Sequence, residues 1–351
     1  MGFPLINTDV VIIGAGPVGI FAAFQSGMLG MKSHVIDPLL EIGGQCTALY
    51  PEKPIYDIPG FPSITARKLI SNLVDQASPF KPVYHLGDSA QKILDDSNDL
   101  LVVTKNGVII SCKGVIIAAG SGAFAPKRPP LFEIENYEEK SVFYSVGEIS
   151  KFYNKKVVIA GGGDSAADWA VELSKVASHI SVIHRRKSFR CTPDTEDKLN
   201  SLFDLGKIEL LVPYQLCALN GLDGELCSVS VKSIDGQKTK NIAADYLLPF
   251  FGIESTLGPI LNWDLAIEKN HILVDQSTCR SSREKVYAVG DIALYKNKIK
   301  LILTGFSEVT MACHDLYKSA FPNSPFNFQH STTKGIDLNL APSDNVESSL
   351  I

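Results

Sequence analysis

Two stretches of the chain share one pattern of apolar and polar positions. In each, a short apolar run rich in β-branched residues leads into a cluster of glycines, and a helix-like apolar periodicity follows. The first stretch covers residues 9–28 and the second residues 156–175. A short, continuous apolar run is typical of a parallel strand that is buried on both faces. The pattern therefore predicts two strand–turn–helix units in an α/β protein.

The glycines of the first stretch have the spacing of a dinucleotide-binding turn. Gly14, Gly16 and Gly19 stand at positions one, three and six of the motif, and Pro17 opens the predicted helix. One glycine permits the tight turn, the second lets a pyrophosphate approach the backbone, and the third lets the helix pack on the strand. The next predicted strand ends in Asp37, where a ribose hydroxyl is expected. Strand, helix and acid together favour a nucleotide site over a turn that only packs.

The second glycine cluster lies in the same setting. Gly161 and Gly163 follow the apolar strand 156–160, and Asp164 and Ser165 begin the predicted helix. The free N–H groups at the start of such a helix, with the positive end of its dipole, attract phosphate. A second dinucleotide is therefore expected on the same chain.

The strand after the second helix ends in basic residues and not in an acid. His184, Arg185 and Arg186 follow residues 179–183 directly, and Arg190 comes shortly after. An acid here would bind a ribose hydroxyl, whereas guanidinium groups match the oxygens of a phosphate. The alternative is an ordinary solvated basic strand end. The position after a glycine-turn unit favours the 2′-phosphate of NADP(H).

Composition narrows the class of protein. The chain has 351 residues and a net charge of −5, which suits two domains and gives no basic balance for nucleic acid. No apolar run approaches membrane length, and the first residues lack the pattern of a signal peptide. We therefore expect a cytoplasmic protein without a nucleic-acid or membrane partner.

The seven cysteines form no Cys-x-x-Cys pair and no zinc-binding spacing, so no metal is expected. Cys46 lies near the first nucleotide turn, but the position five residues later, where a dithiol partner would stand, is Pro51. Cys46 is therefore interpreted as a structural residue.

Motif positions also predict the domain organisation. An apolar strand at 115–119 leads out of the first domain, and another at 286–289 ends in Gly-Asp. The first domain is then discontinuous, with residues 1–117 and 246–333, and residues 118–245 form the inserted second domain. Residues 334–351 are polar and are expected to form a mobile tail.

Further motifs extend this picture over residues 8–333. They are Gly43-Gly44-Gln45, Tyr50-Pro51-Glu52-Lys53, the segment 55–62, Asp168-Trp169-Ala170, Phe189-Arg190, Gly290-Asp291, Thr304-Gly305-Phe306 and His330-Ser331-Thr332-Thr333. In this order they resemble the thioredoxin-reductase-like (type 2) ferredoxin–NADP reductase family. The resemblance implies two Rossmann-like, three-layer nucleotide-binding domains, one for FAD and one for NADP(H), and a homodimer. Thioredoxin reductase itself has a cysteine pair before its second glycine turn, whereas residues 144–148 here contain none.

The resemblance also implies roles for single residues. Tyr50 and His330 are expected to stack on opposite faces of the flavin. Further FAD contacts are implied for Gly44, Gln45, Ala90, Phe124, Asp291 and Thr332. A helix from Thr304 to about Ser319 is expected to point its N-terminus at the flavin ring.

The implied activity is that of a ferredoxin–NADP⁺ reductase, which exchanges electrons between NADPH and an iron–sulfur ferredoxin through FAD without a dithiol. Two alternatives stay open. One is an NADPH-dependent flavin reductase that serves flavodoxin, a quinone or a separate thiol protein, and the other is a non-catalytic NADP-sensing flavoprotein. Candidate basic residues for docking an acidic ferredoxin are Lys53, Lys296, Lys298 and Lys300.

Overall fold

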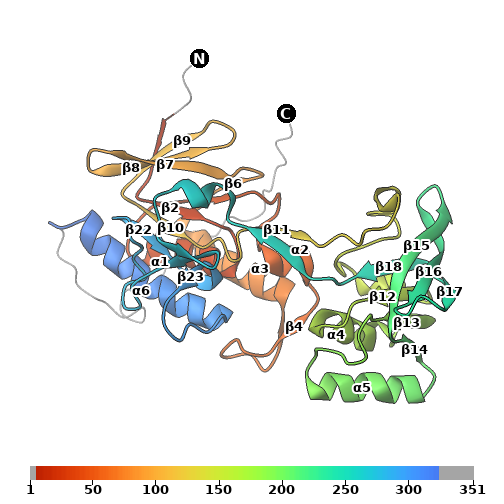
Figure 1. Ribbon diagram of the computed structural model, residues 1–351. Helices are drawn as coiled ribbons and strands as arrows, with labels where there is room; N and C mark the ends of the chain where they lie inside the picture. The colour runs from red at the N-terminus through yellow and green to blue at the C-terminus, as the bar shows by residue number, and fades with distance from the viewer. Residues whose placement is uncertain (1–4, 324–351) are drawn as a thin grey trace. The chain divides into compact units, whose positions relative to one another are not determined.

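The computed structural model describes residues 5–323 (Figure 1). By contacts between Cα atoms this part of the chain divides into two compact units. Unit 1 contains residues 5–123 and 255–323, and unit 2 contains Phe124–Glu254. The chain thus leaves unit 1, forms all of unit 2, and returns.

The central sheet of unit 1 is parallel, with strand order β22-β10-β2-β3-β6. Its strands are β2 (Val10–Ile13), β3 (Ser33–Asp37), β6 (Val83–Leu86), β10 (Gly114–Ile117) and β22 (Val286–Ala288). A second sheet, with strand order β1-β9-β8-β7, is formed by β1 (Leu5–Asn7), β7 (Ala90–Asp96), β8 (Asp99–Thr104) and β9 (Ile109–Cys112).

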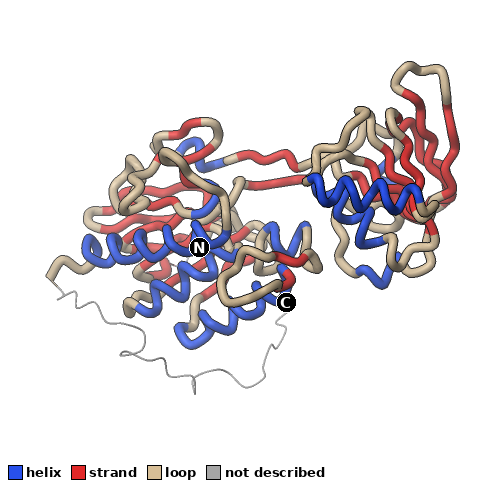
Figure 2. The backbone as a smooth tube through the Cα atoms, turned by 90° about the horizontal axis from the view of Figure 1, so that it is seen from below, coloured by secondary structure: helices blue, strands red, loops and turns tan. Residues whose placement is uncertain are grey.

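Side chains of β2 show how the layers of unit 1 are held together. Val10 and Ile12 pack with residues of the helices α1 (Pro17–Met28) and α6 (Ile302–Ala320), while Val11 and Ile13 pack with residues of the second sheet. Because alternate side chains of a strand point to opposite faces, both faces of the central sheet are covered. Figures 1 and 2 show the helices on one face, so unit 1 has three layers.

Shorter elements complete unit 1. The helices are α2 (Gln45–Leu49), α3 (Ala66–Ala77) and the 3₁₀ turns η1 (Ser78–Phe80), η4 (Gly258–Asn262) and η5 (Gly290–Ile292). The strands are β4 (Pro54–Ile55), β5 (Ile64–Thr65), β20 (Ile267–Glu268), β21 (His271–Leu273) and β23 (Ala293–Leu294).

Unit 2 repeats the same architecture. A parallel sheet of order β14-β13-β12-β18 contains β12 (Lys156–Ala160), β13 (His179–Ile183), β14 (Ile208–Leu211) and β18 (Tyr246–Pro249). Helices α4 (Asp164–Leu173) and α5 (Pro193–Asp204) share one apolar cluster with it. An antiparallel sheet of β15 (Tyr214–Leu222), β16 (Glu225–Ser233) and β17 (Thr239–Ala243) contributes to a second cluster. The turns η2 (Ile134–Asn136) and η3 (Ile149–Phe152) precede β12.

The two crossings between the units lie further along the chain than the sequence patterns indicated. β11 (Ala123–Pro126) and β19 (Ile253–Thr256) pair as a two-stranded sheet at the crossings. Residues 246–249, expected to begin the return to the first domain, form β18, which pairs in parallel with β12. An apolar run alone does not reveal which of two similar sheets it will join.

Candidate functional site

The first glycine turn of unit 1 connects β2 to α1. Gly14 has φ +109°, and a Cβ there would lie 2.4 Å from the carbonyl oxygen of Ala118. A Cβ on Gly19 would lie 1.8 Å from the oxygen of Gly14. A Cβ on Gly16, the N-cap of α1, would meet no protein atom within 4 Å. Two glycines thus permit close packing, while the third leaves free space beside backbone N–H groups, as a bound pyrophosphate requires.

Asp37 fixes the turn from the end of β3. One of its carboxylate oxygens accepts a hydrogen bond from the Ala15 N–H at 2.6 Å, and the other accepts one from the Leu39 N–H at 2.8 Å. Burial raises the pKa of the carboxyl group, and these two hydrogen bonds act in the opposite direction. Because each oxygen has a second lone pair, Asp37 can order the turn and still accept a ribose hydroxyl.

A second glycine segment packs against the first. The Gly43 N–H donates to the Ala15 carbonyl at 2.8 Å, and a Cβ on Gly44 would lie 3.1 Å from the Cα of Gly16. Gly44 has φ +56° and is the N-cap of α2, in which Gln45 is the first residue. Gln45 donates a long hydrogen bond of 3.4 Å to the Ser121 hydroxyl, beyond the carboxyl end of β10. The structure therefore brings Gly44 and Gln45 to the edge of the sheet where Gly16 lies.

Tyr50 follows α2 directly. Its hydroxyl lies 3.5 Å from the Cys46 sulfur, and burial together with Cys46 and the carboxylates Asp291 and Asp57 raises its pKa. Burial also raises the pKa of the Cys46 thiol, which is 2% exposed. Cys46 is therefore a protonated packing residue, and Tyr50 is a neutral phenol on the same side of unit 1 as Asp291.

Asp291 is positioned by the turn after β22. Gly290, with φ +75°, turns the chain into η5. The Gly290 N–H donates to Glu308 of α6 at 2.7 Å. The expected helix at 304–319 is observed as Ile302–Ala320.

Unit 2 has its own glycine turn, between β12 and α4. A Cβ on Gly161 would lie 2.6 Å from the Phe250 carbonyl oxygen, whereas one on Gly163 would meet nothing within 4 Å. Gly163 is the N-cap of α4, and Asp164 and Ser165 are exposed in the first turn of the helix. The division between packing and open glycines is the same as in unit 1.

The basic segment after β13 is attached to this turn. The Arg190 N–H donates to the Gly162 carbonyl at 2.7 Å, and Arg190 and Gly163 form a parallel bridge. Arg185, Arg186 and Arg190 are exposed. Three exposed arginines therefore lie near His184 in the segment that is attached to the glycine turn. Guanidinium groups match the oxygens of a phosphate, so this segment suits a second phosphate group beside the helix N-terminus.

His184 differs from the arginines that follow it. It is 7% exposed, a Cβ on Gly162 would lie 2.1 Å from its ring, and its Nε2 is 3.1 Å from the Ser188 carbonyl oxygen. Burial and the three nearby arginines lower its pKa. A neutral His184 ring therefore packs against Gly162 of the glycine turn. Its contact with a cofactor remains a prediction.

Comparison with known proteins agrees with this geometry. The family model described as pyridine nucleotide-disulphide oxidoreductase matches residues 8–308. The chain belongs to this family. A ferredoxin–NADP reductase of Ehrlichia ruminantium (strain Gardel) is 61% identical over 329 residues, which are 94% of this chain and 98% of that one. One of Wolbachia pipientis wMel is 61% identical over 332 residues, again 94% and 98% of the two chains.

Solved structures with the same fold include thioredoxin reductases. That of T. acidophilum has a TM-score of 0.74 at 22% identity and covers 90% of this chain and 99% of its own. That of Lactococcus lactis has a TM-score of 0.73 at 22% identity, with the same coverage. These two structures confirm the predicted fold class, and the family model with the two relatives confirms the predicted family.

Four further site residues are expected from the family resemblance. Ala90 begins β7 and is 6% exposed within the core between the sheets, and Phe124 lies on β11 at a crossing between the units. Cofactor contacts from both remain predictions. His330, Thr332 and the tail 334–351 lie outside the described residues.

The sequence patterns misplaced one candidate docking residue. The Lys298 side chain is 3% exposed and forms an ion pair with Glu308, so it cannot belong to a surface patch. Lys296 and Lys300 are exposed. Glu308 was not among the residues expected from the sequence, although an acid within the apolar face of α6 could have indicated a buried partner.

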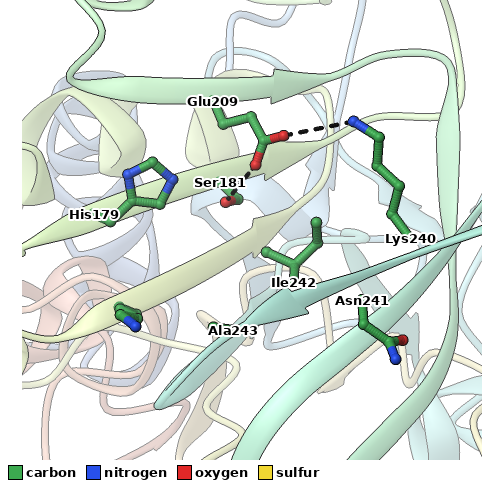
Figure 3. Close-up of a pocket in the computed structure, with 8 residues that line it drawn as sticks. His179, Ser181, Glu209, Lys240, Asn241, Ile242 and Ala243 are labelled. Carbon is green, nitrogen blue, oxygen red and sulfur yellow. Dashed lines mark hydrogen bonds and ion pairs between the residues drawn. The ribbon is translucent and has the colours of Figure 1, made fainter.

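A pocket in unit 2 lies at the end of the parallel strands that is opposite to the glycine turn (Figure 3). Lys156 and His179, the first residues of β12 and β13, line it together with Ser181, Glu209, Lys240, Asn241, Ile242 and Ala243. The Ser181 hydroxyl donates to the Glu209 carboxylate at 3.2 Å, and Glu209 forms an ion pair with Lys240 at 3.8 Å. Because nucleotides bind at the carboxyl ends of parallel strands, this pocket is separate from the glycine turn.

Two further observations concern residues 5–323. None of the helices in this range is long and apolar enough to cross a membrane. The same residues contain no cluster of three or more histidine, cysteine, aspartate or glutamate side chains that could hold a metal ion.

Proposed function

We propose that this chain is an FAD-dependent ferredoxin–NADP⁺ reductase, with FAD at the glycine turn of unit 1 and NADP(H) at that of unit 2. Each turn has an open glycine at a helix N-cap, so the residues present fit both groups. The relatives at 61% identity carry the name ferredoxin–NADP reductase, and they cover almost the whole chain.

The observation that carries the proposal is the state of the cysteines. All seven lie among the described residues, no two of them are closer than ten positions in the sequence, and Cys46, which follows Gly43 and Gly44, is buried. Two nucleotide-binding glycine turns without a thiol pair require an electron acceptor outside the chain. Bound FAD would accept a hydride from NADPH and release electrons singly, which suits an iron–sulfur partner.

The chain's own residues would bind and orient the cofactors. Arg185, Arg186 and Arg190 would hold the 2′-phosphate of NADP(H), and Asp37 would accept a hydrogen bond from a ribose hydroxyl of FAD. Tyr50 would cover one face of the flavin, with its phenol kept neutral by burial. The family resemblance assigns the other face to His330, which lies outside the described residues. By the same resemblance, Asp291 would contact the ribityl chain, and Gln45, Ala90, Phe124 and Thr332 would also touch FAD.

We also propose a cytoplasmic homodimer. The test of the function is NADPH-dependent reduction of cytochrome c, measured with and without a ferredoxin. The proposal expects a large stimulation by ferredoxin and no turnover of a thioredoxin disulfide. Equal rates with and without ferredoxin, together with stimulation by flavodoxin, would assign a different acceptor. A bound flavin that NADPH does not bleach would indicate a sensor.

A further inference from the structure

Three segments of unit 1 meet at one buried carboxylate, that of Glu308 in α6. One oxygen accepts the Gly290 N–H at 2.7 Å. The other accepts the Tyr295 hydroxyl at 2.6 Å and is ion-paired with the Lys298 ammonium. The partners come from the turn after β22 and from the loop between β23 and α6, so this carboxylate ties both segments to the helix.

The pair is almost fully removed from water. The Lys298 and Glu308 side chains are 3% and 1% exposed. Taking two charges out of water is costly and is repaid only when geometry and hydrogen bonding are good. Such pairs are therefore weak as stabilisers, and their best-attested use is to specify one arrangement of the chain.

The arrangement specified here is that of the Gly290–Asp291 turn. Gly290 has φ +75° and is buried. A Cβ on Gly305 of α6 would lie 2.5 Å from a methyl group of Val18 and 3.4 Å from the Cα of Gly290. The turn, the first part of α6 and the start of α1 are thus in direct contact beside the glycine turn.

We propose that Glu308, Lys298 and Tyr295 form a positioning network that holds Asp291 and the first turn of α6 in the geometry that binds FAD. None of the three is assigned a contact with FAD, and each acts through the turn or the helix. The inference rests on the proposed placement of FAD in unit 1.

A matched control exists on the same helix. Asp315 also accepts a hydrogen bond from a tyrosine hydroxyl, that of Tyr287 at 2.8 Å, and forms an ion pair with Arg280 at 2.6 Å. Its side chain is 22% exposed. In these contacts it resembles Glu308, but none of them reaches the Gly290–Asp291 turn.

The test compares Glu308→Gln with Asp315→Asn in protein freed of flavin, with FAD affinity and the thermal midpoint of the apoprotein as separate readouts. Both variants are expected to lower the midpoint. Only Glu308→Gln is expected to weaken FAD binding, by about tenfold or more, because it leaves Lys298 buried without its counter-charge. Equal FAD affinities of the two variants would show that Glu308 has a merely structural role.

A double-variant cycle gives an independent readout. Lys298→Met leaves the carboxylate unpaired, whereas Lys298→Met with Glu308→Gln removes both charges. The loss of FAD affinity in the double variant is expected to be smaller than the product of the losses in the two single variants. If the factors by which the two single variants weaken FAD binding simply multiply in the double variant, the proposed network would be refuted.

Tyr295→Phe serves if the charge variants do not fold. It removes one hydrogen bond to a charged acceptor and is expected to weaken FAD binding by about tenfold. An unchanged affinity would exclude Tyr295 and its carboxylate from positioning. Wild-type apoprotein that binds no FAD would instead refute the proposed function, so the two failures are distinguishable.

Discussion

At the residue scale, the basic segment of unit 2 divides into charges that face solvent and a ring that does not. Arg185 and Arg186 are exposed, while His184 is buried against Gly162. Arg185→Ala with Arg186→Ala should therefore weaken NADPH binding by about 1–3 kcal/mol, the size of charge-assisted hydrogen bonds to phosphate. The measurement is KM for NADPH and for NADH, and the NADH value should stay unchanged.

Lys175→Ala is the control for this change, because Lys175 is an exposed cation of the same unit whose ion pair is with Glu172. It should alter neither KM value. A wild type that uses NADH and NADPH equally well would contradict the assignment of the arginines.

Cys46 allows a second test at this scale. Burial raises its pKa, so the folded protein favours the neutral thiol. The stability linked to this group is complete below the unfolded pKa and is lost as the pH rises through the higher folded value. Cys46 should therefore react slowly with thiol reagents at neutral pH and faster in alkali, while the exposed Cys217 and Cys227 react at once.

Cys46→Ser should leave NADPH–ferricyanide activity nearly intact, because a hydroxyl replaces the sulfur beside Tyr50 and no electron passes through it. Loss of that activity, with FAD still bound, would give Cys46 a redox role.

At the element scale, the two glycine turns make the same separation between packing and binding. Gly16→Ala and Gly163→Ala place a methyl group where no protein atom lies within 4 Å. They should leave the thermal midpoint of the apoprotein almost unchanged and weaken FAD and NADP⁺ binding respectively. Gly14→Ala should instead lower the midpoint by several degrees, because its Cβ would meet Ala118 and its φ is +109°. A drop in midpoint for Gly16→Ala would contradict the open cradle.

Elements built from strong periodic patterns could be predicted from the sequence. The strands expected at 156–160 and 179–183 are observed with those bounds, and both helices that follow the glycine turns are present. α2 and η5 could not be predicted, because their short backbones depend on positive φ at Gly44 and Gly290 and on contacts with distant residues. The same reason hid Glu308, whose partners are set by tertiary structure.

At the scale of the whole molecule, net charge is unfavourable for an acidic partner. The chain carries −5, so a ferredoxin must dock at a local basic surface. Lys296→Glu with Lys300→Glu should lower ferredoxin-dependent rates and leave flavin reduction by NADPH unchanged. Wild-type rates with ferredoxin should fall as salt rises. Salt-independent rates would remove electrostatic docking from the proposal.

The two units each contain a complete glycine turn with its own acid or arginines, so binding of the two cofactors should be separable. In flavin-free protein, NADP⁺ should slow hydrogen exchange only in peptides from about residues 157–190, which include the turn and the basic segment. FAD should protect peptides from residues 10–50 and 286–308, where Asp37, Tyr50 and Asp291 lie. Gly163→Ala is expected to reduce the protection by NADP⁺ alone, and Gly16→Ala the protection by FAD alone. If NADP⁺ protected unit 2 only after FAD had bound, the glycine turn of unit 2 would depend on that of unit 1, which would contradict independent binding by the two units.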